Sequence, residues 1–326
     1  MSWQAFLDQL GAVRDERGEV QHFGGHVTPR LVLATPLAVI TATGPDTEKF
    51  LQGQLTCDLR PVLTGHWRLA MHLDLKGRGQ FSYLVLPTAT GVALLTEQQR
   101  ADSALAALKK YAAFSKVALQ RDDSLVPMLM HGPEAGHALS GLPLPTQVGE
   151  TSTGPHSSLA RLTPDTLLLL TAEDSARHLL NHYTVAELGG ADAWRRYCIH
   201  QGLGLIEPGG EGLWLPQALN YDLNDGVSFR KGCYLGQEVV ARMHFKGKMK
   251  QRMQALRWQA GVSAAPGSAL RNDDGQSVGE LVTLVADNEH TDALVVLRLD
   301  HQGGLSLEGQ ALQWQRLPLP YALPQE

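Results

Sequence analysis

The chain has 326 residues, of which 43% are hydrophobic and 19% charged, a composition typical of globular proteins. This length predicts more than one structural unit, because single hydrophobic cores stop growing at roughly 250 to 300 residues. The formal net charge of −5 excludes a generally cationic nucleic-acid coat protein, although it says nothing of local patches.

The metal-binding and targeting patterns are sparse. The three cysteines, Cys57, Cys198 and Cys233, are widely spaced, and without a CxxC pair they predict neither a zinc ribbon nor a disulfide framework. His22 and His26 have helical spacing, but the glycines between them argue against a helix, so no metal site is expected.

The N-terminus lacks the basic region of a signal peptide, and apolar runs fall short of the ~20 residues that span a bilayer. We therefore expect a soluble, cytoplasmic protein.

The first half of the chain alternates strand and helix patterns. Residues 1–30 predict a short helix and then a loosely held arm. Pro45 suits a first helical position, and the acids that follow it favour the positive end of a helix, so a helix is predicted to start there. The other predicted elements are strands at 37–41, 68–75, 80–86, 92–96, 117–119 and 126–130, a hairpin turn at 76–79, and a helix at 100–112 with Ala101, Leu105, Leu108 and Tyr111 on its apolar stripe.

The second half begins with a stretch rich in Gly, Pro, Ser and Thr at 141–156, which predicts a surface loop or seam. A strand at 167–171 and helices at 173–183 and 193–201 follow. Beyond about residue 252, short strands alternate with turns at 272–275, 287–290 and 302–304, a pattern typical of a small β-barrel or sandwich. The sequence thus predicts an α+β protein with a two-lobed region at 1–245 and a C-terminal barrel domain at 246–326.

Residues 227–242, Val-Ser-Phe-Arg-Lys-Gly-Cys-Tyr-Leu-Gly-Gln-Glu-Val-Val-Ala-Arg, carry the most specific chemical pattern. Gly232 and Gly236 bracket Cys233, so the backbone can turn and another group can approach closely. Lys231 would favour the thiolate, and a helix start after Gly236 would leave the cysteine near an electropositive end. The alternative is a buried, inert cysteine in a glycine-containing loop.

The run Lys-Gly-Cys-Tyr-x-Gly-Gln-Glu at 231–238 resembles the signature of the YgfZ group, folate-binding tRNA-modifying proteins related to the glycine-cleavage T-protein. Less specific matches follow the same order, and the resemblance runs from about residue 36 to the end. They are Gly44-x-Asp46, 50–58, Lys76-Gly77-Arg78, 108–117, Trp194, Pro216-Gln217-x-x-Asn220 and the tail at 317–323.

The resemblance implies a T-protein-like, three-lobed ring of two α+β parts and a C-terminal small β-barrel around a central folate site. It also implies a cytoplasmic role in tRNA modification, methylthiolation included, and in the upkeep of iron–sulfur enzymes. The implied cofactor is tetrahydrofolate or a derivative, and the implied protein partners are iron–sulfur tRNA-modifying enzymes. The sequence carries no DNA-binding motif.

A folate receptor needs an aromatic wall, hydrogen-bond partners for the pterin edge and a cation for the glutamate tail. Trp194 matches a family tryptophan implicated in folate contact, although a core aromatic residue would fit the same position. His200 and Gln201 stand where the family often has a glutamate. The candidate cofactor-binding residues are therefore Trp194, Gln201, Tyr234, Gln237 and Arg242, while Cys233 and Lys231 are the candidate functional thiol and its partner.

Basic residues gather between positions 230 and 257, where Glu238 is the only acid. This local positive field could hold a polyglutamate tail or an RNA backbone, and a solvated face is the alternative. Because no RNA-reading pattern of interleaved aromatic residues is present, the expected link to tRNA is indirect. The basic residues are Arg230, Lys231, Arg242, Lys246, Lys248, Lys250, Arg252 and Arg257.

Three functions fit these patterns: a folate-dependent accessory factor for tRNA modification, a tetrahydrofolate-dependent aminomethyltransferase, and a non-catalytic folate-sensing adaptor. The T-protein carries an aspartate pair in the strand after its first hairpin. The corresponding strand here offers Ser82 or Tyr83, and neither supplies a carboxylate at neutral pH. We therefore expect no glycine-cleavage activity. A pure sensor would not need a reactive Cys233.

Overall fold

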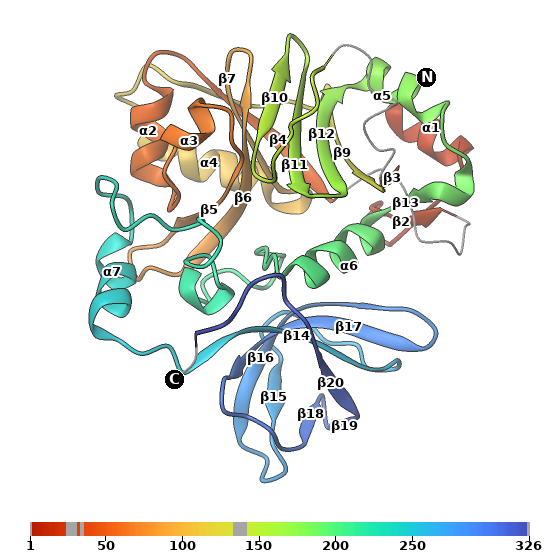
Figure 1. The fold of residues 1–326 in the computed structure, drawn as a ribbon, viewed down its shortest axis with the longest axis vertical. Coiled ribbons are helices and arrows are strands. Elements are labelled where there is room, and N and C mark those ends of the chain that lie inside the picture. The colour runs from red at the N-terminus through yellow and green to blue at the C-terminus, as the bar shows by residue number, and fades with distance from the viewer. Residues whose placement is uncertain (1, 24–30, 33–35, 133–141, 325–326) are drawn as a thin grey trace. The chain divides into compact units, whose positions relative to one another are not determined.

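The computed structural model describes residues 2–23, 31–32, 36–132 and 142–324 (Figure 1). The chain forms two compact units, each built from separate stretches of sequence. The first unit comprises Met1–Leu51, Asp58–Arg68 and Tyr83–Trp194, and the second unit comprises Gln52–Cys57, Leu69–Ser82 and Arg195–Glu326. The domain boundary near residue 245 stays a prediction.

The helices in the described residues are short. They are α1 (Trp3–Gln9), α2 (Thr47–Gln54), α3 (Arg60–Leu63), α4 (Ala101–Tyr111), α5 (Glu173–Leu180), α6 (Ala191–Gln201) and α7 (Gln237–Lys246), with 3₁₀ turns η1 (Gln98–Arg100), η2 (Val185–Glu187) and η3 (Pro216–Leu219). None of the helices in this part of the chain is both long and apolar enough to cross a membrane.

An eight-stranded sheet lies in the first unit, in the order β1-β2-β13-β3-β9-β12-β11-β10. Neighbouring strands are antiparallel except for β13 and β3, which are parallel. The strands are β1 (Ala12–Arg14), β2 (Val20–Phe23), β3 (Leu31–Val32), β9 (Leu125–His131), β10 (Thr151–Gly154), β11 (Ser157–Thr163), β12 (Thr166–Ala172) and β13 (Leu188–Gly189).

The centre of this sheet is buried on both faces. Leu167 and Leu169 of β12 join one hydrophobic core with residues of α1 and α5. Leu168 and Leu170, which point to the opposite face, are also at most 1% exposed. Burial on both faces explains why this strand reads as an unbroken apolar run rather than as an alternating pattern.

A five-stranded sheet has the order β5-β6-β7-β4-β8. Strand β4 pairs antiparallel with both β7 and β8, and β6 pairs antiparallel with β7. The hairpin turn expected at 76–79 lies between β5 and β6, where the Asp74 N–H donates to the Arg78 carbonyl. The strands are β4 (Leu37–Thr43), β5 (Arg68–Leu73), β6 (Gly79–Thr88), β7 (Gly91–Glu97) and β8 (Ala118–Arg121), so the predicted strands of this region are confirmed.

Two helix predictions need correction. Helix α2 starts at Thr47 and not at Pro45, because the Asp46 carboxylate accepts from the backbone N–H of Lys116 (2.7 Å) and holds the turn before the helix. Helix α4 has the predicted bounds within a residue, but it buries Ala104 and leaves Tyr111 43% exposed. The buried stripe of α4 is therefore Ala101, Ala104 and Leu108 and differs from the stripe that the sequence pattern indicated.

The N-terminal arm and the seam also differ from expectation. The arm folds back as the β1–β2 hairpin, whose turn is fixed by the Asp15 carboxylate accepting from the N–H groups of Arg17 and Glu19. The 141–156 stretch contains β10, so it is not only a loop. Residues 24–30 and 141 of these two segments lie outside the described residues.

A seven-stranded antiparallel sheet forms the C-terminal part of the second unit, in the order β19-β18-β15-β16-β17-β14-β20. It is barrel-like, and its interior is a separate hydrophobic core that includes Leu256, Trp258, Leu281 and Val295. The α+β class is thus confirmed. The strands are β14 (Gln251–Gln259), β15 (Ala269–Arg271), β16 (Ser277–Ala286), β17 (His290–Arg298), β18 (Leu305–Leu307), β19 (Gln310–Leu312) and β20 (Trp314–Leu317).

Candidate functional site

Cys233 lies in a loop of the second unit between η3 and α7, and we call residues 226–236 the cysteine loop. Its thiol is exposed, whereas Cys57 and Cys198 are 0% and 4% exposed. Cys57 and Cys198 are thus core residues. Cys233 is therefore the one thiol of this chain that a reagent or partner can reach in the folded protein.

The cysteine loop is bound along residues 53–57. The Ser228 N–H donates to the Thr56 carbonyl (2.9 Å), and the Leu235 N–H donates to the Gly53 carbonyl (3.2 Å). The Thr56 hydroxyl donates in turn to the Gly226 carbonyl (2.6 Å). Because these bonds satisfy backbone groups on both sides, the loop is held in one path although its cysteine faces solvent.

Lys231 anchors the middle of the loop. Its Nζ donates to the carbonyl oxygens of Gln52 (2.8 Å), Leu55 (2.5 Å) and Cys57 (2.7 Å). These carbonyls belong to the C-terminal end of α2 and the residues just after it, where acceptors lack helical partners and a cation is favoured. The same Nζ lies 4.8 Å from the ring centroid of Tyr234. The ammonium thus has a structural task in fixing the path of the backbone that carries Cys233.

Of the two glycines that bracket Cys233, only Gly236 is required by close approach. Gly236 has a φ of 77°, and a Cβ there would lie 2.5 Å from the Asp74 carbonyl oxygen. Gly77, in the β5–β6 turn, has a φ of 74°, and a Cβ on it would lie 2.9 Å from the Val239 Cβ. The turn therefore packs directly on the start of α7. No heavy atom lies within 4 Å of a Cβ built on Gly232, so this glycine does not serve close approach.

Tyr234 and Gln237 are brought together, because the Tyr234 N–H donates to the Gln237 Oε1 (3.2 Å). The Tyr234 side chain is 6% exposed, and burial raises the pKa of its phenol, which is therefore neutral at neutral pH. Its Oη has no hydrogen-bond partner among the described residues. A buried hydroxyl without a partner is costly, so this atom fits a ligand that offers an acceptor, as the polar edge of a pterin does. Arg242 is exposed one turn further along α7.

Trp194 and Gln201 share α6 and lie seven residues apart, which places them on one face of the helix. Trp194 is 1% exposed and belongs to the first unit, whereas Gln201 is half-buried and belongs to the second. The Trp194 ring is therefore buried, as expected for the core aromatic residue that was the alternative to a folate contact.

His200 binds an aspartate that the sequence pattern did not single out. Asp292 on β17 is fully buried and accepts from His200 Nε2 (2.9 Å), Arg196 (2.9 Å) and Arg257 (2.5 Å). Burial would raise the pKa of Asp292, but these hydrogen bonds and the arginine charges hold it well below its usual range. An aspartate inside the apolar strand 290–298 was the available signal, since a buried carboxylate requires partners.

Ser82 and Tyr83, which the resemblance places where T-protein has its acids, are both buried. Ser82 is 3% exposed, and its Oγ accepts from the Ile206 N–H (2.8 Å). Tyr83 is fully buried, and burial raises the pKa of its phenol above its usual range. Neither side chain presents a carboxylate.

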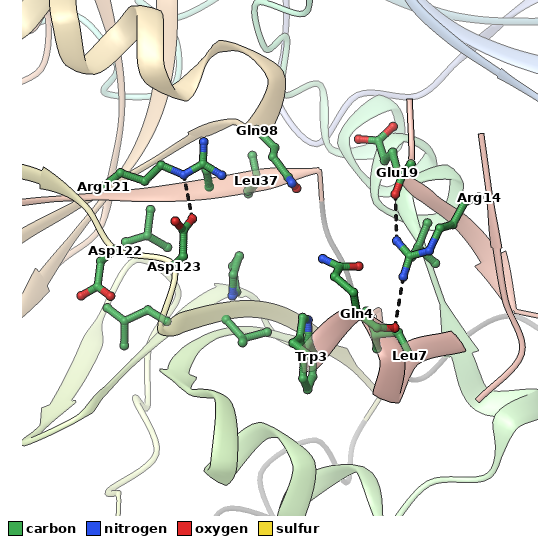
Figure 2. Close-up of a pocket in the computed structure, with 17 residues that line it drawn as sticks. Trp3, Gln4, Leu7, Arg14, Glu19, Leu37, Gln98, Arg121, Asp122 and Asp123 are labelled. Atoms are coloured by element: carbon green, nitrogen blue, oxygen red, sulfur yellow. Dashed lines mark hydrogen bonds and ion pairs between the residues drawn. The ribbon is translucent and has the colours of Figure 1, made fainter. Parts of the chain in front are cut away.

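A cavity in the first unit lies among α1, β4 and the start of β9 (Figure 2). Its volume of about 110 Å³ is below the roughly 300 to 1,000 Å³ of typical ligand pockets. Arg121 on its wall pairs with Asp123 (2.7 Å), and Arg14 pairs with Asp8 (2.9 Å). None of the candidate site residues lines it, so this cavity is not the candidate folate site.

Among the residues that the structure describes, no group of three or more His, Cys, Asp or Glu side chains could hold a metal ion. His26, which the sequence analysis considered, lies outside those residues.

No protein-family model matches the chain. Among solved structures, it is similar to aminomethyltransferase T of the glycine cleavage system from Bartonella henselae, with a TM-score of 0.75 and 17% identity over 97% of this chain and 96% of that one. At that identity the likeness shows the fold alone, and it confirms the predicted T-protein-like architecture.

Curated relatives carry closer sequence similarity. The chain is 33% identical to the tRNA-modifying protein YgfZ of Sodalis glossinidius, over 91% of this chain and 94% of that protein. It is 32% identical to the proteins of the same name from Serratia proteamaculans, over 92% of this chain and 95% of that one, and Vibrio vulnificus, over 89% and 91%. Identity of this degree over nine-tenths of both lengths shows that the chain belongs to the YgfZ family.

Proposed function

We propose that the protein is a folate-binding accessory factor that acts in the cytoplasm and supports tRNA modification, including methylthiolation, by maintaining iron–sulfur enzymes. The names of its relatives support the link to tRNA modification. The observation that carries the proposal is the exposed Cys233 thiol on a loop that Lys231 and residues 53–57 hold in place. One cysteine cannot hold a cluster alone, so Cys233 acts on a group that a partner enzyme brings.

In this proposal, reduced folate binds beside the cysteine loop. The Tyr234 phenol and the Gln237 amide bond the pterin edge, and Arg242 pairs with the glutamate carboxylates. Gln201 contributes a further polar contact, and Trp194 is kept as a candidate folate contact because it matches the family tryptophan. The neutral, buried Tyr234 Oη without a partner among the described residues supports this assignment.

Folate binding is tested by calorimetric titration with tetrahydrofolate. Tyr234→Phe keeps the buried ring and removes only the Oη, so we expect an affinity loss of about five- to tenfold, the effect of one hydrogen bond. Trp194→Phe should weaken binding and abolish most of the tryptophan fluorescence quenching. Unchanged affinity in Tyr234→Phe, Gln237→Leu and Trp194→Phe together would reject the folate assignment.

The thiol is tested by complementation of a strain that lacks the family member, reading methylthiolated tRNA. Cys233→Ser should fold normally and lose support of methylthiolation, because the exposed side chain makes no contribution to a core. The matched variants Cys57→Ala and Cys198→Ala alter buried thiols and should retain it. If all three complement equally, Cys233 is only a loop residue, and the folate-sensing adaptor becomes the better description.

A further inference from the structure

Three aromatic rings from two separate stretches of the second unit form one cluster, in which His244 and Phe245 are exposed and Phe229 is half-buried. The rings of Phe229 and His244 are stacked, with centroids 3.7 Å apart and an interplanar angle of 13°. The Phe245 ring stands nearly perpendicular to both, 4.8 Å from His244 and 6.1 Å from Phe229. We call these three residues the aromatic cluster. Phe245 is 69% exposed, although hiding so large an apolar ring from water would be favourable.

Basic residues flank the aromatic cluster in the sequence. Arg230 lies in the cysteine loop, Lys246 ends α7, and Lys248 and Lys250 follow the helix. Arg230, Lys246, Lys248 and Lys250 are all exposed, and within the described part of the chain none of them forms an ion pair. Glu238, at the other end of α7, is the only acid between positions 230 and 257. In a chain with a net charge of −5, this concentration of unneutralised cations attracts a polyanion.

The combination of aromatic rings and unpaired basic side chains favours one class of polyanion over the others. A paired duplex offers phosphates but keeps its bases stacked inside, so an exposed phenylalanine gains little from it. An anionic membrane also attracts lysines, but a broad apolar face is needed to stabilise binding to it, and here one ring, that of Phe245, is largely exposed. An unpaired RNA stretch offers both phosphates and free base faces, which stack on aromatic side chains.

We propose that the aromatic cluster and its basic neighbours bind an unpaired segment of RNA. Bases stack on Phe245 and on the Phe229–His244 pair, and phosphates are held by Arg230, Lys246 and Lys248. The inference rests on the proposed function in one respect, namely that the natural RNA is a tRNA loop. It replaces the expectation of a purely indirect link to tRNA, which followed from the absence of interleaved aromatic residues in the sequence.

Folding produces what the linear sequence conceals. Phe229 precedes α7 in the cysteine loop, and His244 and Phe245 belong to the last turn of the helix (Figure 1, cyan). Only the return of the chain through α7 stacks them. Because Phe229 and Cys233 share one anchored loop, the proposal also brings unpaired RNA bases to the neighbourhood of the exposed thiol.

The test is fluorescence anisotropy with the full chain and two labelled RNAs of equal length, a stem–loop with an unpaired loop and a fully paired duplex. We expect tighter binding of the stem–loop. Phe245→Leu, which keeps apolar volume but removes the ring, should weaken stem–loop binding by about 5- to 100-fold and leave duplex binding nearly unchanged. Phe114→Leu is the matched control, because Phe114 is fully exposed in the first unit, and it should bind like the unaltered protein.

The phosphate contacts are tested by salt dependence. Lys246→Gln with Lys248→Gln should reduce the slope of log K against log salt concentration by about 1.4, since each contact with a single strand contributes roughly 0.7. Lys109→Gln with Lys110→Gln changes the net charge equally, in exposed lysines of α4, and should leave the slope unchanged. Equal effects of both lysine pairs would mean that only the overall charge matters and would overturn the proposal.

The remaining outcomes are equally decisive. Equal affinity for stem–loop and duplex, or equal weakening of both by Phe245→Leu, would reject base stacking. Binding to anionic phosphatidylserine vesicles that Phe245→Leu weakens, without an effect on RNA, would identify a membrane surface instead. Titration of the same variants with monoglutamyl tetrahydrofolate separates the two proposals. Failure of RNA selectivity with intact folate binding rejects only this inference, and RNA selectivity without folate binding rejects only the proposed function.

Discussion

Lys231→Met is the sharpest test of how the cysteine loop is held. The substitution keeps an unbranched side chain of similar length and removes the ammonium that donates to the carbonyls of Gln52, Leu55 and Cys57. A hydrogen bond to a charged group contributes on the order of 1.5–3 kcal/mol. The three bonds share one ammonium whose burial has its own cost, and water can reach part of this half-buried site. We therefore expect a loss of about 2–4 kcal/mol in the free energy of unfolding.

Urea unfolding measures the loss, and Lys49→Met, an exposed lysine of α2, is the matched control with an expected change below about 0.5 kcal/mol. A second readout is local. The amide hydrogens of Ser228 and Leu235 should exchange faster in Lys231→Met, because their bonds to residues 56 and 53 depend on the same loop path. Stability within 0.5 kcal/mol of the unaltered protein, with unchanged exchange at both amides, would refute the anchoring role.

Three further predictions concern the second unit. Asp292→Asn should destabilise the protein by about 3 kcal/mol in urea unfolding, because Arg196, His200 and Arg257 would lose their buried counter-charge; a change below about 1 kcal/mol would contradict this. Burial lowers the pKa of His72 to about 4, against about 6.5 in the unfolded chain. The stability present above pH 6.5 should therefore fall by roughly 3 kcal/mol as the pH drops towards 4, because the unfolded chain binds the proton more readily. His72→Phe should flatten that part of the curve of unfolding free energy against pH. Gly236→Ala should lower the free energy of unfolding by on the order of 2 kcal/mol, because of its left-handed backbone and the contact with the Asp74 carbonyl. Gly232→Ala should lower it by less than about 0.5 kcal/mol. Equal thermal stability of the two variants would show that the close approach at Gly236 is not constrained.

The fold was largely predictable where a pattern repeats locally. The turns expected at 272–275, 287–290 and 302–304 bracket the short strands that became β16 and β17, and the turn at 76–79 predicted the β5–β6 hairpin. Helix boundaries were less secure because distant groups decide them. The Asp46 carboxylate accepts from the backbone N–H of Lys116, seventy residues later in the chain, and α2 starts only after Asp46. No local pattern encodes this contact.

The candidate site was predictable in its position but not in its contacts. The glycines that bracket Cys233 indicated a turn, which the structure shows at Gly236. The sequence left open whether the thiol is accessible or buried, and the structure shows that it is exposed. The hydrogen-bond acceptors of Lys231 lie more than 170 residues earlier in the chain and are mainly backbone oxygens, so sequence reasoning assigned the lysine to the nearby cysteine instead. The same distance in sequence hid the partners of Asp292.

The anchor of the cysteine loop also affects how this family can vary. At positions 55 and 57, Lys231 binds main-chain oxygens, and every amino acid supplies the same oxygen there. The lysine thus imposes no side-chain identity on those two positions, and neither can compensate for its loss by a matching substitution. In an evolutionary comparison, Lys231 should be retained without any covarying partner at residues 55 and 57, so a search for coupled substitutions would miss a contact on which the path of the loop depends.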